Sequence, residues 1–191
     1  MIYERCTLPD VVLCKPQVHI DDRGYFFESF RLDSLQDFVG YKLGFCQDNE
    51  SKSQYGVIRG LHFQRSPFAQ TKLIRVLKGA VLDVAVDMRK DSPTFGAHVC
   101  VELTAENKHQ LLIPKGFAHG FSVLSDEAVL AYKCDAFYAP QYDSGVLYND
   151  PALGIDWLIP EAHRILSAKD LALPKFKEAS YAEPEQKDSQ S

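Results

Sequence analysis

Turn signals recur at intervals of roughly ten residues from residue 72 onward, and this spacing is typical of an all-β sandwich or barrel. Between the turns lie short runs rich in aliphatic and aromatic residues: "KLIRVLKGAVLDVAVDMR", "AHVCVELT", "HQLLIPKGFAHGFSVLSD" and "AVLAYKCDAFY". Strands do not alternate with helical patterns, which disfavours a parallel doubly wound sheet. We therefore expect an all-β jelly roll, in which inward-facing side chains can line a ligand cavity.

Three local signals predict how the chain turns. In "RLDSLQDFVG", residues 31–40, the apolar residues have helical spacing and Gly40 is placed to end the helix. The pair Lys78-Gly79 separates two β-rich runs and predicts a hairpin between them. Near the end of the chain, Ser167 is a candidate cap for a short helical turn.

The size and composition of the chain predict one domain. Of its 191 residues, 46% are hydrophobic and 12% are aromatic, which is enough for a sizeable core. We expect a single jelly-roll domain over residues 1–176. The last stretch, 177–191, is polar and poor in large apolar residues, so we expect it to be a flexible tail.

The charge pattern argues against two classes of partner. The net charge is −5 and no long basic run occurs, so nucleic-acid binding is not expected. The amino terminus, "MIYERCTLPD", carries charges where a signal peptide needs an apolar stretch. No apolar run reaches the roughly 18 residues of a membrane span. We expect a cytoplasmic protein that does not enter membranes.

The cysteine pattern agrees with that location. The chain has five cysteines, an odd number, with wide spacings and without a C-x-x-C motif. A disulfide framework or a zinc knuckle would look different. We interpret Cys6, Cys14, Cys46, Cys100 and Cys134 as small buried hydrophobes in a reducing compartment.

Polar residues that can do chemistry lie on several of these apolar strands. In "GVIRGLHFQ", an arginine and a histidine interrupt a strand that nearly alternates apolar and polar positions. Taken singly, such residues are explained by surface ion pairs, solvated strand ends or core aromatics. Their number, on strands that must also bury one face, favours a functional site. The candidates are Arg23, Glu28, Gln47, Asn49, Arg59, His62, Lys72, His119, Tyr132, Lys169 and Asp170.

A metal site is disfavoured by the spacing of these candidates. Jelly rolls of the cupin type often bind a metal through a His-x-His pair, a following glutamate and a distant histidine. Here Gln64 stands two residues after His62, and the next carboxylate is Asp83, although His119 is placed to be the distant histidine. Two imidazoles without a nearby carboxylate make a poor metal cage. Imidazole, phenol, ammonium and guanidinium groups instead suit proton abstraction next to a carbonyl.

Several segments in a fixed order resemble one protein family. They are "DDRGYFFE", "FCQDNESKSQYGVIRGLHFQ", "QTKLIRVLKGAVLDVAVDMRKDSPTFG", "LTAENKHQLLIPKGFAHGFSVLSDEAVLAYKC", "YAPQYDSGVLYNDPALGIDW" and "ILSAKD". The chain resembles the dTDP-4-dehydrorhamnose 3,5-epimerases, the RmlC type of sugar-nucleotide epimerase. The resemblance implies a cupin-type jelly roll (a double-stranded β-helix) with short peripheral helices, forming a homodimer without metal or organic cofactor. It also implies inversion of dTDP-4-dehydro-6-deoxy-D-glucose at C3 and C5, giving dTDP-4-dehydro-L-rhamnose.

The resemblance also implies residue roles. The family's base falls on His62, its orienting carboxylate on Asp170, the cation near the enolate oxygen on Lys72, and the acid of the opposite face on Tyr132. Tyr138 is similar to the aromatic residue that stacks on thymine. The residues implied to hold the sugar and the nucleotide diphosphate are Arg23, Glu28, Gln47, Asn49, Arg59, His119, Asp143 and Lys169.

The chain departs from the family pattern at three positions. Asp143 stands where a glutamate is usual, Tyr148 where a tryptophan is usual, and Glu50 where a histidine is common. Relatives with the same residues act at one carbon only, so a single-centre epimerase of a related nucleotide-linked 4-ketosugar is the alternative. A sugar-nucleotide binding protein without catalysis is the alternative from another functional class.

One geometric prediction follows for the strand that carries Arg59 and His62. Residues three apart on a regular strand face opposite sides. If both side chains serve one substrate, the strand must be irregular between them. We therefore predict a bulge or bend near Gly60.

Overall fold

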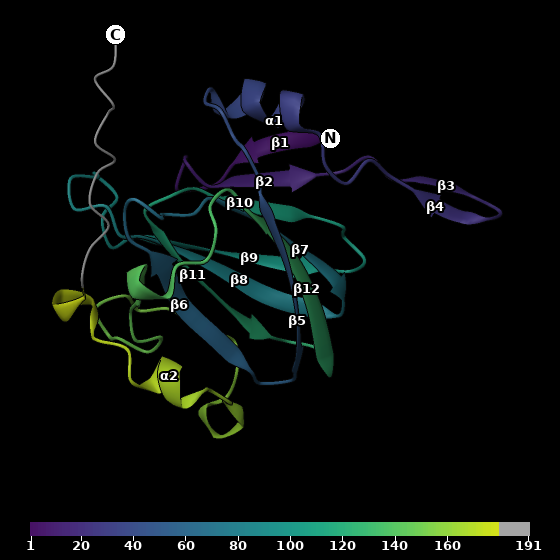
Figure 1. The fold of residues 1–191 in the computed structure, drawn as a ribbon. Helices are drawn as coiled ribbons and strands as arrows, with labels where there is room; N and C mark the ends of the chain where they lie inside the picture. The colour runs from purple at the N-terminus through teal and green to yellow at the C-terminus, as the bar shows by residue number, and fades with distance from the viewer. Residues whose placement is uncertain (180–191) are drawn as a thin grey trace, which may run out of the picture.

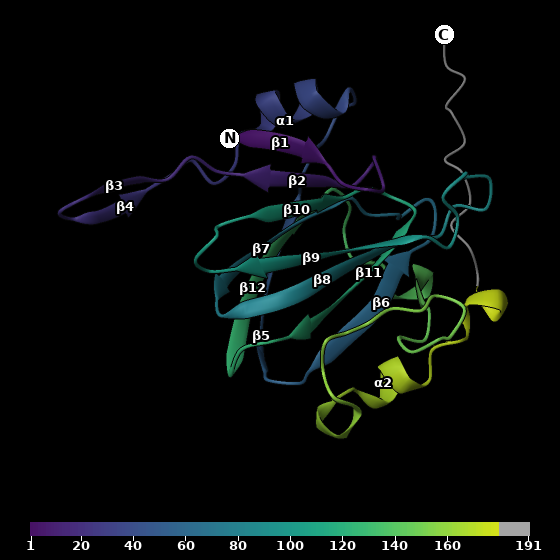
Figure 2. The same cartoon turned by 180° about the vertical axis from the view of Figure 1, so that it is seen from behind.

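The computed structural model describes residues 1–179, which form two antiparallel β-sheets packed face to face (Figures 1 and 2). The six-stranded sheet has the order β1 (Ile2–Arg5), β2 (Val12–Lys15), β10 (Gln110–Ile113), β7 (Lys72–Lys78), β12 (Glu127–Cys134) and β5 (Gln47–Gln54). The five-stranded sheet has the order β13 (Asp143–Gly145), β6 (Ile58–Gln64), β11 (Phe117–Val123), β8 (Ala80–Asp87) and β9 (His98–Thr104). This arrangement confirms the expected all-β jelly roll.

Alternation along the strands divides the apolar residues between two clusters. Every second residue of β8, such as Val81 and Ala85, points between the sheets and packs with residues of the opposite sheet such as Ile74. The residues between them, such as Val84, face outward and are covered by the carboxyl-terminal segment, where Trp157 is 1% exposed. Because both faces of β8 are buried, this strand reads as a nearly continuous apolar run.

The helices are short and peripheral. Helix α1 (Leu32–Val39) ends at Gly40 in the left-handed conformation, as predicted, and packs Leu35 against the sheet beside β2 and β10. Ser167 caps α2 (Ala168–Leu171) by accepting a hydrogen bond from the backbone N–H of Asp170, also as predicted. Three 3-10 turns complete the set: η1 (Pro140–Tyr142), η2 (Glu161–His163) and η3 (Phe176–Glu178). None of the helices within residues 1–179 is long and apolar enough to cross a membrane.

The predicted flexible tail is only partly described. Its first residues belong to η3, and Ala179 is 5% exposed against the outer apolar cluster. The rest of the predicted tail, 180–191, lies outside the described residues.

The predicted hairpin at Lys78-Gly79 is wrong. β7 pairs with β10 and β12, whereas β8 pairs with β11 and β9, so the two strands belong to different sheets. Gly79 has a φ of 77°, and a Cβ there would lie 2.0 Å from the carbonyl oxygen of Glu127. A glycine with positive φ allows a tight corner as readily as a hairpin turn. Here it carries the chain from one sheet to the other.

The expectation of five buried cysteines is also only partly correct. All five are free thiols, but Cys46 and Cys100 are exposed. Cys46 precedes β5, and Cys100 points outward from the edge strand β9. Cys14 and Cys134 are buried as expected, and burial raises the pKa of the Cys14 thiol to about 12.

A hairpin near the amino terminus projects from the body of the molecule (Figures 1 and 2). It consists of β3 (His19–Asp21) and β4 (Gly24–Phe26), which pair only with each other. Its apolar side chains are exposed, with Ile20 at 82%, Phe26 at 72% and Tyr25 at 60%. Large apolar groups held in water on an extended arm are typical of a surface that another molecule covers.

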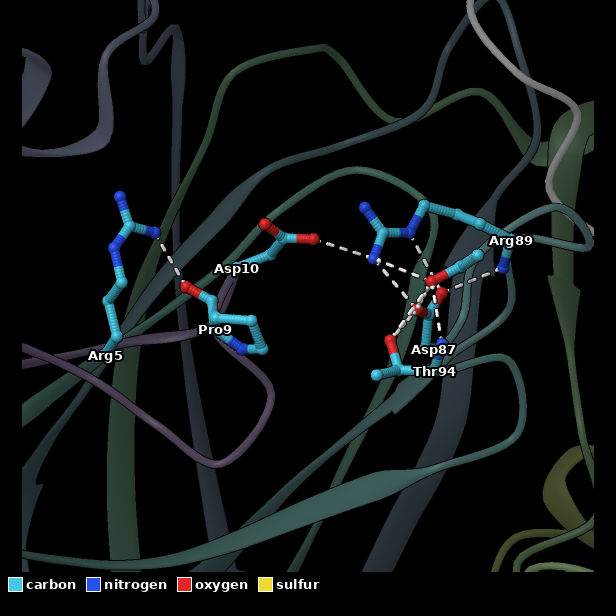
Figure 3. Close-up of polar contacts among 7 residues, drawn as sticks. Arg5, Pro9, Asp10, Asp87, Arg89 and Thr94 are labelled. Atoms are coloured by element: carbon cyan, nitrogen blue, oxygen red, sulfur yellow. Dashed lines mark hydrogen bonds and ion pairs between the residues drawn. The ribbon is translucent and has the colours of Figure 1, made fainter.

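A polar network fastens the end of β8 to the turn after β1 (Figure 3). Arg89 contacts Asp87 at 2.8 Å and Asp10 at 2.8 Å, and the hydroxyls of Ser92 and Thr94 donate to Asp87. Burial opposes ionisation of Asp87, but these contacts outweigh it and lower the pKa of its carboxyl to about 2. The network therefore has a structural role: it holds the end of β8 against the turn that contains Asp10.

Candidate active site

Two adjoining hollows gather the residues that the sequence singled out. The central cavity, of about 560 Å³, lies between the sheets beside α2, and the outer hollow, of about 250 Å³, adjoins it. Both are lined by His62, Lys72, Tyr132 and Lys169. The central cavity adds Arg59, His119 and Asp170, and the outer hollow adds Gln47, Asn49, Tyr138 and Asp143.

The bulge predicted near Gly60 is confirmed. On β11, His119 pairs with His62 and Phe121 pairs with Arg59, so β6 has one extra residue between the two pairs. Gly60 has a φ of 119°, and a Cβ there would lie 2.6 Å from the backbone of β11. The extra residue resets the alternation of β6, so Arg59 and His62 both line the central cavity.

The imidazole of His62 is held by a carboxylate from the carboxyl-terminal segment. Its Nε2 lies 2.6 Å from Oδ1 of Asp170, whose side chain is 6% exposed. The Ser167 hydroxyl donates to the other oxygen of Asp170 at 2.8 Å. Burial opposes ionisation of Asp170, but the contacts with His62 and Ser167 outweigh it and keep its pKa below the usual range. Nδ1 of His62 is left as the ring nitrogen that can take up a proton.

Lys72 and Tyr132 reach the cavity from neighbouring strands of the opposite sheet. Burial lowers the pKa of Lys72, and the nearby Cys134, Asp143 and Asp83 oppose this shift. Burial raises the pKa of Tyr132, so its hydroxyl keeps its proton at neutral pH. The cavity thus contains an ammonium group with a reduced affinity for its proton and a phenol that can donate one.

A second histidine–carboxylate pair lies deeper in the sheet. Nε2 of His119 lies 3.1 Å and 3.0 Å from the two oxygens of Asp83, a residue with 0% exposure in the middle of β8. Each imidazole of the cavity therefore has its own carboxylate partner. Within residues 1–179, there is no group of three or more His, Cys, Asp or Glu side chains that could hold a metal ion.

The outer hollow is a polar ring around an exposed tyrosine. Tyr138 is 53% exposed and its hydroxyl donates to Asp143 at 3.3 Å. The carboxylate of Asp143 also pairs with Lys169, and this pairing raises the pKa of Lys169. Gln47 accepts a hydrogen bond from the backbone N–H of Tyr138 at 3.0 Å and donates to Asn49 at 2.9 Å. An accessible ring next to cations and amides suits an aromatic base that carries phosphates.

Within one chain, Arg23 and Glu28 do not reach either hollow. Arg23 lies at the turn of the projecting hairpin, where its side chain is 89% exposed and pairs with Asp21 at 2.6 Å. Glu28 follows the hairpin and is exposed. Within the described chain, the ion pair that Arg23 forms with Asp21 is a surface ion pair.

Two of the three departures from the family pattern, Tyr148 and Glu50, lie away from both hollows. Tyr148 is 7% exposed and packs beside Trp157, whose indole N–H donates to the backbone carbonyl of Tyr148 at 2.8 Å. Glu50 is exposed on β5, between the inward-facing positions. Asp143, the third departure, is the one that lines the outer hollow.

Sequence reasoning missed two groups that support the cavity. Asp83 was considered only as a remote metal ligand, yet a carboxylate inside the apolar run "AVLDVAVD" is a signal in itself, because a buried charge needs a partner. Ser167 was recognised as a helix cap but not as the group that orients Asp170. Asp83 itself holds His119, and Ser167 orients the carboxylate that holds His62.

Comparison with known proteins identifies the family. The family model described as dTDP-4-dehydrorhamnose 3,5-epimerase matches residues 5–178. A Shigella flexneri protein of that name is 52% identical over 177 residues, covering 93% of this chain and 97% of its own.

Solved structures agree in fold and sequence. The dTDP-4-dehydrorhamnose 3,5-epimerase of Elizabethkingia anophelis is 50% identical, with a TM-score of 0.90 over 93% of this chain and 97% of its own. An RmlC structure from Legionella pneumophila, in complex with dTDP-4-keto-L-rhamnose, is 44% identical, with a TM-score of 0.91 over 96% and 98% of the two chains. A chain so similar along its whole length shares more than a fold. It belongs to the dTDP-4-dehydrorhamnose 3,5-epimerase family.

Proposed function

We propose that this protein inverts C3 and C5 of dTDP-4-dehydro-6-deoxy-D-glucose and so forms dTDP-4-dehydro-L-rhamnose. The observation that carries the proposal is the convergence of His62, Lys72 and Tyr132 on one cavity. They come from β6, β7 and β12, and therefore from both sheets. A base and an acid on opposite walls, with a cation between them, are what inversion next to a ketone requires.

The proposed chemistry at each carbon has two proton transfers. The 4-keto group makes the hydrogens on C3 and C5 acidic. Nδ1 of His62 removes one of them while Asp170 stabilises the resulting imidazolium. The electron pair moves into an enolate, whose oxygen is stabilised by the ammonium of Lys72. Tyr132 then returns a proton to the opposite face of the carbon, which inverts it and restores the ketone. His62 then gives its proton to water and Tyr132 takes one from water, so that the pair can act at the second carbon.

The outer hollow is proposed to hold the nucleotide. Tyr138 stacks on the thymine ring, and Lys169 and Arg59 interact with the diphosphate. Gln47, Asn49 and His119 bind polar groups of the substrate. Asp143, one methylene shorter than the usual glutamate, is already engaged by Lys169 and by the Tyr138 hydroxyl. The nucleotide must therefore compete with these contacts or use them as they stand.

We further propose a homodimer in which the projecting hairpin completes the site of the partner. The exposed Ile20, Tyr25 and Phe26 supply apolar contact area on the arm. Arg23 and Glu28, which the family resemblance assigns to the substrate, lie on or beside that arm and away from their own cavity. Mixing Arg23→Ala and His62→Ala subunits should restore activity that neither variant has alone. Two variants that stay inactive when mixed would contradict a shared site.

Heavy water provides the test of the reaction. With dTDP-4-dehydro-6-deoxy-D-glucose, the protein should incorporate deuterium at both C5 and C3, detected by NMR of the product. Incorporation at one carbon only would support the single-centre alternative. His62→Ala and Tyr132→Phe should abolish the exchange while some affinity for the nucleotide sugar remains. Exchange that is unchanged in both variants would overturn the assignment of His62 and Tyr132. Binding of the sugar nucleotide without any exchange by the unsubstituted protein would support the non-catalytic alternative.

A cytoplasmic location remains part of the proposal. All five cysteines are free thiols, and two of them are exposed, which suits a reducing compartment. Fractionation of cells that produce the untagged chain would test it.

A further inference from the structure

Gln64, the last residue of β6, has contacts that none of the proposed roles explains. It is 3% exposed, although glutamine is usually a surface residue. Its side-chain Nε2 donates to the backbone carbonyls of Phe68, at 2.7 Å, and Phe137, at 3.2 Å. Its Oε1 accepts a hydrogen bond from the backbone N–H of Ala139 at 2.6 Å. Three of the four hydrogen-bonding positions of a terminal amide are thus used on backbone groups.

These contacts hold the backbone immediately before and after Tyr138. Gln64 holds the backbone on either side of it, through the carbonyl of Phe137 and the N–H of Ala139. The backbone N–H of Tyr138 itself is held by Gln47. The tyrosine side chain, in contrast, is 53% exposed, and within residues 1–179 it makes a single hydrogen bond, of 3.3 Å, to Asp143. The ring is therefore placed by its backbone rather than by packing around it.

The Phe137 side chain also gives this segment little support by packing. It is 65% exposed, so it does not anchor the segment in the core. An unsupported loop with two exposed aromatic rings would sample many positions, and ordering it on binding would weaken the affinity. Gln64 removes this freedom in advance, because its amide replaces water on buried backbone groups.

We propose that Gln64 is a positioning residue that holds Tyr138 ready to stack on the nucleobase. This inference rests on the proposed function, in which Tyr138 binds thymine. Gln64 does not line the central cavity, and its amide is engaged by backbone groups of the segment around Tyr138. Its contribution therefore belongs to nucleotide binding and not to the proton transfers.

Gln64→Met tests the proposal, because methionine has a similar length and no amide. We expect the KM for the dTDP-ketosugar and the Kd for dTDP alone to rise about tenfold, with kcat within about twofold of the original. The matched control is Gln36→Met. Gln36, on α1, also holds a backbone group with its side-chain amide, accepting from the N–H of Leu43 at 2.9 Å, but it lies outside both hollows. It should leave both constants unchanged.

A double-variant cycle shows whether the effect passes through the tyrosine. Tyr138→Ala alone should weaken dTDP binding, and Gln64→Met should add little in that background. If the two losses multiply independently, or if Gln64→Met lowers kcat and leaves the Kd for dTDP unchanged, the proposal is overturned. Failure of the unsubstituted protein to bind dTDP would instead overturn the proposed function.

Hydrogen exchange on the unsubstituted protein keeps the test open if Gln64→Met does not fold. The Ala139 amide should exchange slowly, because Gln64 accepts its hydrogen bond in a buried place. It should also be slow without dTDP, since the position is set in advance. Fast exchange of this amide in the free protein, with protection gained only on binding dTDP, would overturn the proposal.

Discussion

The two histidine–carboxylate pairs of the cavity are built from the same groups but differ in surroundings. His62 has a side chain 30% exposed and meets one oxygen of Asp170, which a peripheral helix supplies. His119 has a side chain 10% exposed and meets both oxygens of Asp83, which is buried in the centre of a sheet. The first pair is therefore partly solvated, and the second is almost fully buried.

The comparison shows that a pair of residue types does not define a role. A proton acceptor must gain a charge in the transition state, which a partly solvated ring with an orienting carboxylate can do. A ring held by both oxygens of a buried carboxylate has a fixed orientation and Nε2 committed as a donor. It is suited to recognise substrate rather than to exchange protons with it. The following substitutions test this division, from the largest expected effect to the smallest.

Loss of His62 should have the largest effect on catalysis. His62→Ala removes the proposed base, and we expect kcat to fall about 10⁴-fold, the upper range for a positioned acid or base. His119→Ala should cost much less in kcat and more in KM. Steady-state kinetics with deuterium exchange measures both. Equal loss of exchange in the two variants would abolish the distinction between the pairs.

Asp170→Asn should rank next. The amide keeps the shape but cannot stabilise an imidazolium, so we expect kcat to fall about 10³-fold with little change in KM. The loss should be greater than that caused by Asp83→Asn. The measurement is kcat for the two variants side by side, and the reverse ranking would contradict the assignment of the base to His62.

Asp83→Asn should lower kcat/KM about tenfold, because His119 loses the partner that orients it. The same change removes one of the groups that oppose the lowered pKa of Lys72. The pKa of Lys72 should fall further, so the ammonium should be lost at a lower pH. In a pH–rate profile, the alkaline limb of kcat should therefore move to lower pH in this variant. An unmoved limb would show that Asp83 does not act on Lys72.

Ser167→Ala should have a smaller effect. Asp170 loses one hydrogen bond and α2 loses its cap, each worth about 1 kcal/mol. We expect kcat to fall about fivefold, and thermal unfolding to show a modest loss of stability. A loss of kcat as large as that of Asp170→Asn would mean that the serine does more than orient the carboxylate.

Asp87→Asn should not affect turnover at all, although Asp87 lies four residues from Asp83 on the same strand. Its carboxyl has a pKa of about 2 in the folded chain, lowered from 3.8. Its contribution to stability, about 2 kcal/mol, is thus present above pH 3.8 and lost as the pH falls toward 2. The variant should lack this part of the acid destabilisation in denaturant titrations at several pH values. A change in kcat at neutral pH would contradict a purely structural role.

The sequence predicted most of the fold because its signals are local. Strand spacing, the helix ending at Gly40 and the cap at Ser167 depend on neighbouring residues. The pairing of strands does not, and so Lys78-Gly79 suggested a hairpin where the chain changes sheets. The glycine signal reports a positive φ and does not report which strands meet.

The same limit applies to the candidate site. The bulge in β6 could be predicted because the family resemblance gives Arg59 and His62 to one substrate, so two side chains three residues apart had to face the same way. That His119 meets Asp83, and that Gln64 meets Ala139, depends on residues more than thirty positions apart. That Arg23 and Glu28 lie outside the cavity of their own chain could not be predicted either, because motif order does not show where a residue lies in space.

The extra residue at Gly60 has a consequence for how such a site can change. Deleting one residue there would restore the regular pleat. The side chains on one side of the deletion would then move to the opposite face of the sheet. Either the guanidinium or the imidazole would then leave the cavity, and the apolar side chains behind it would enter. Insertions and deletions are usually harmless in loops. In this strand a single one would separate the guanidinium of Arg59 from the imidazole of His62, which now line the same cavity.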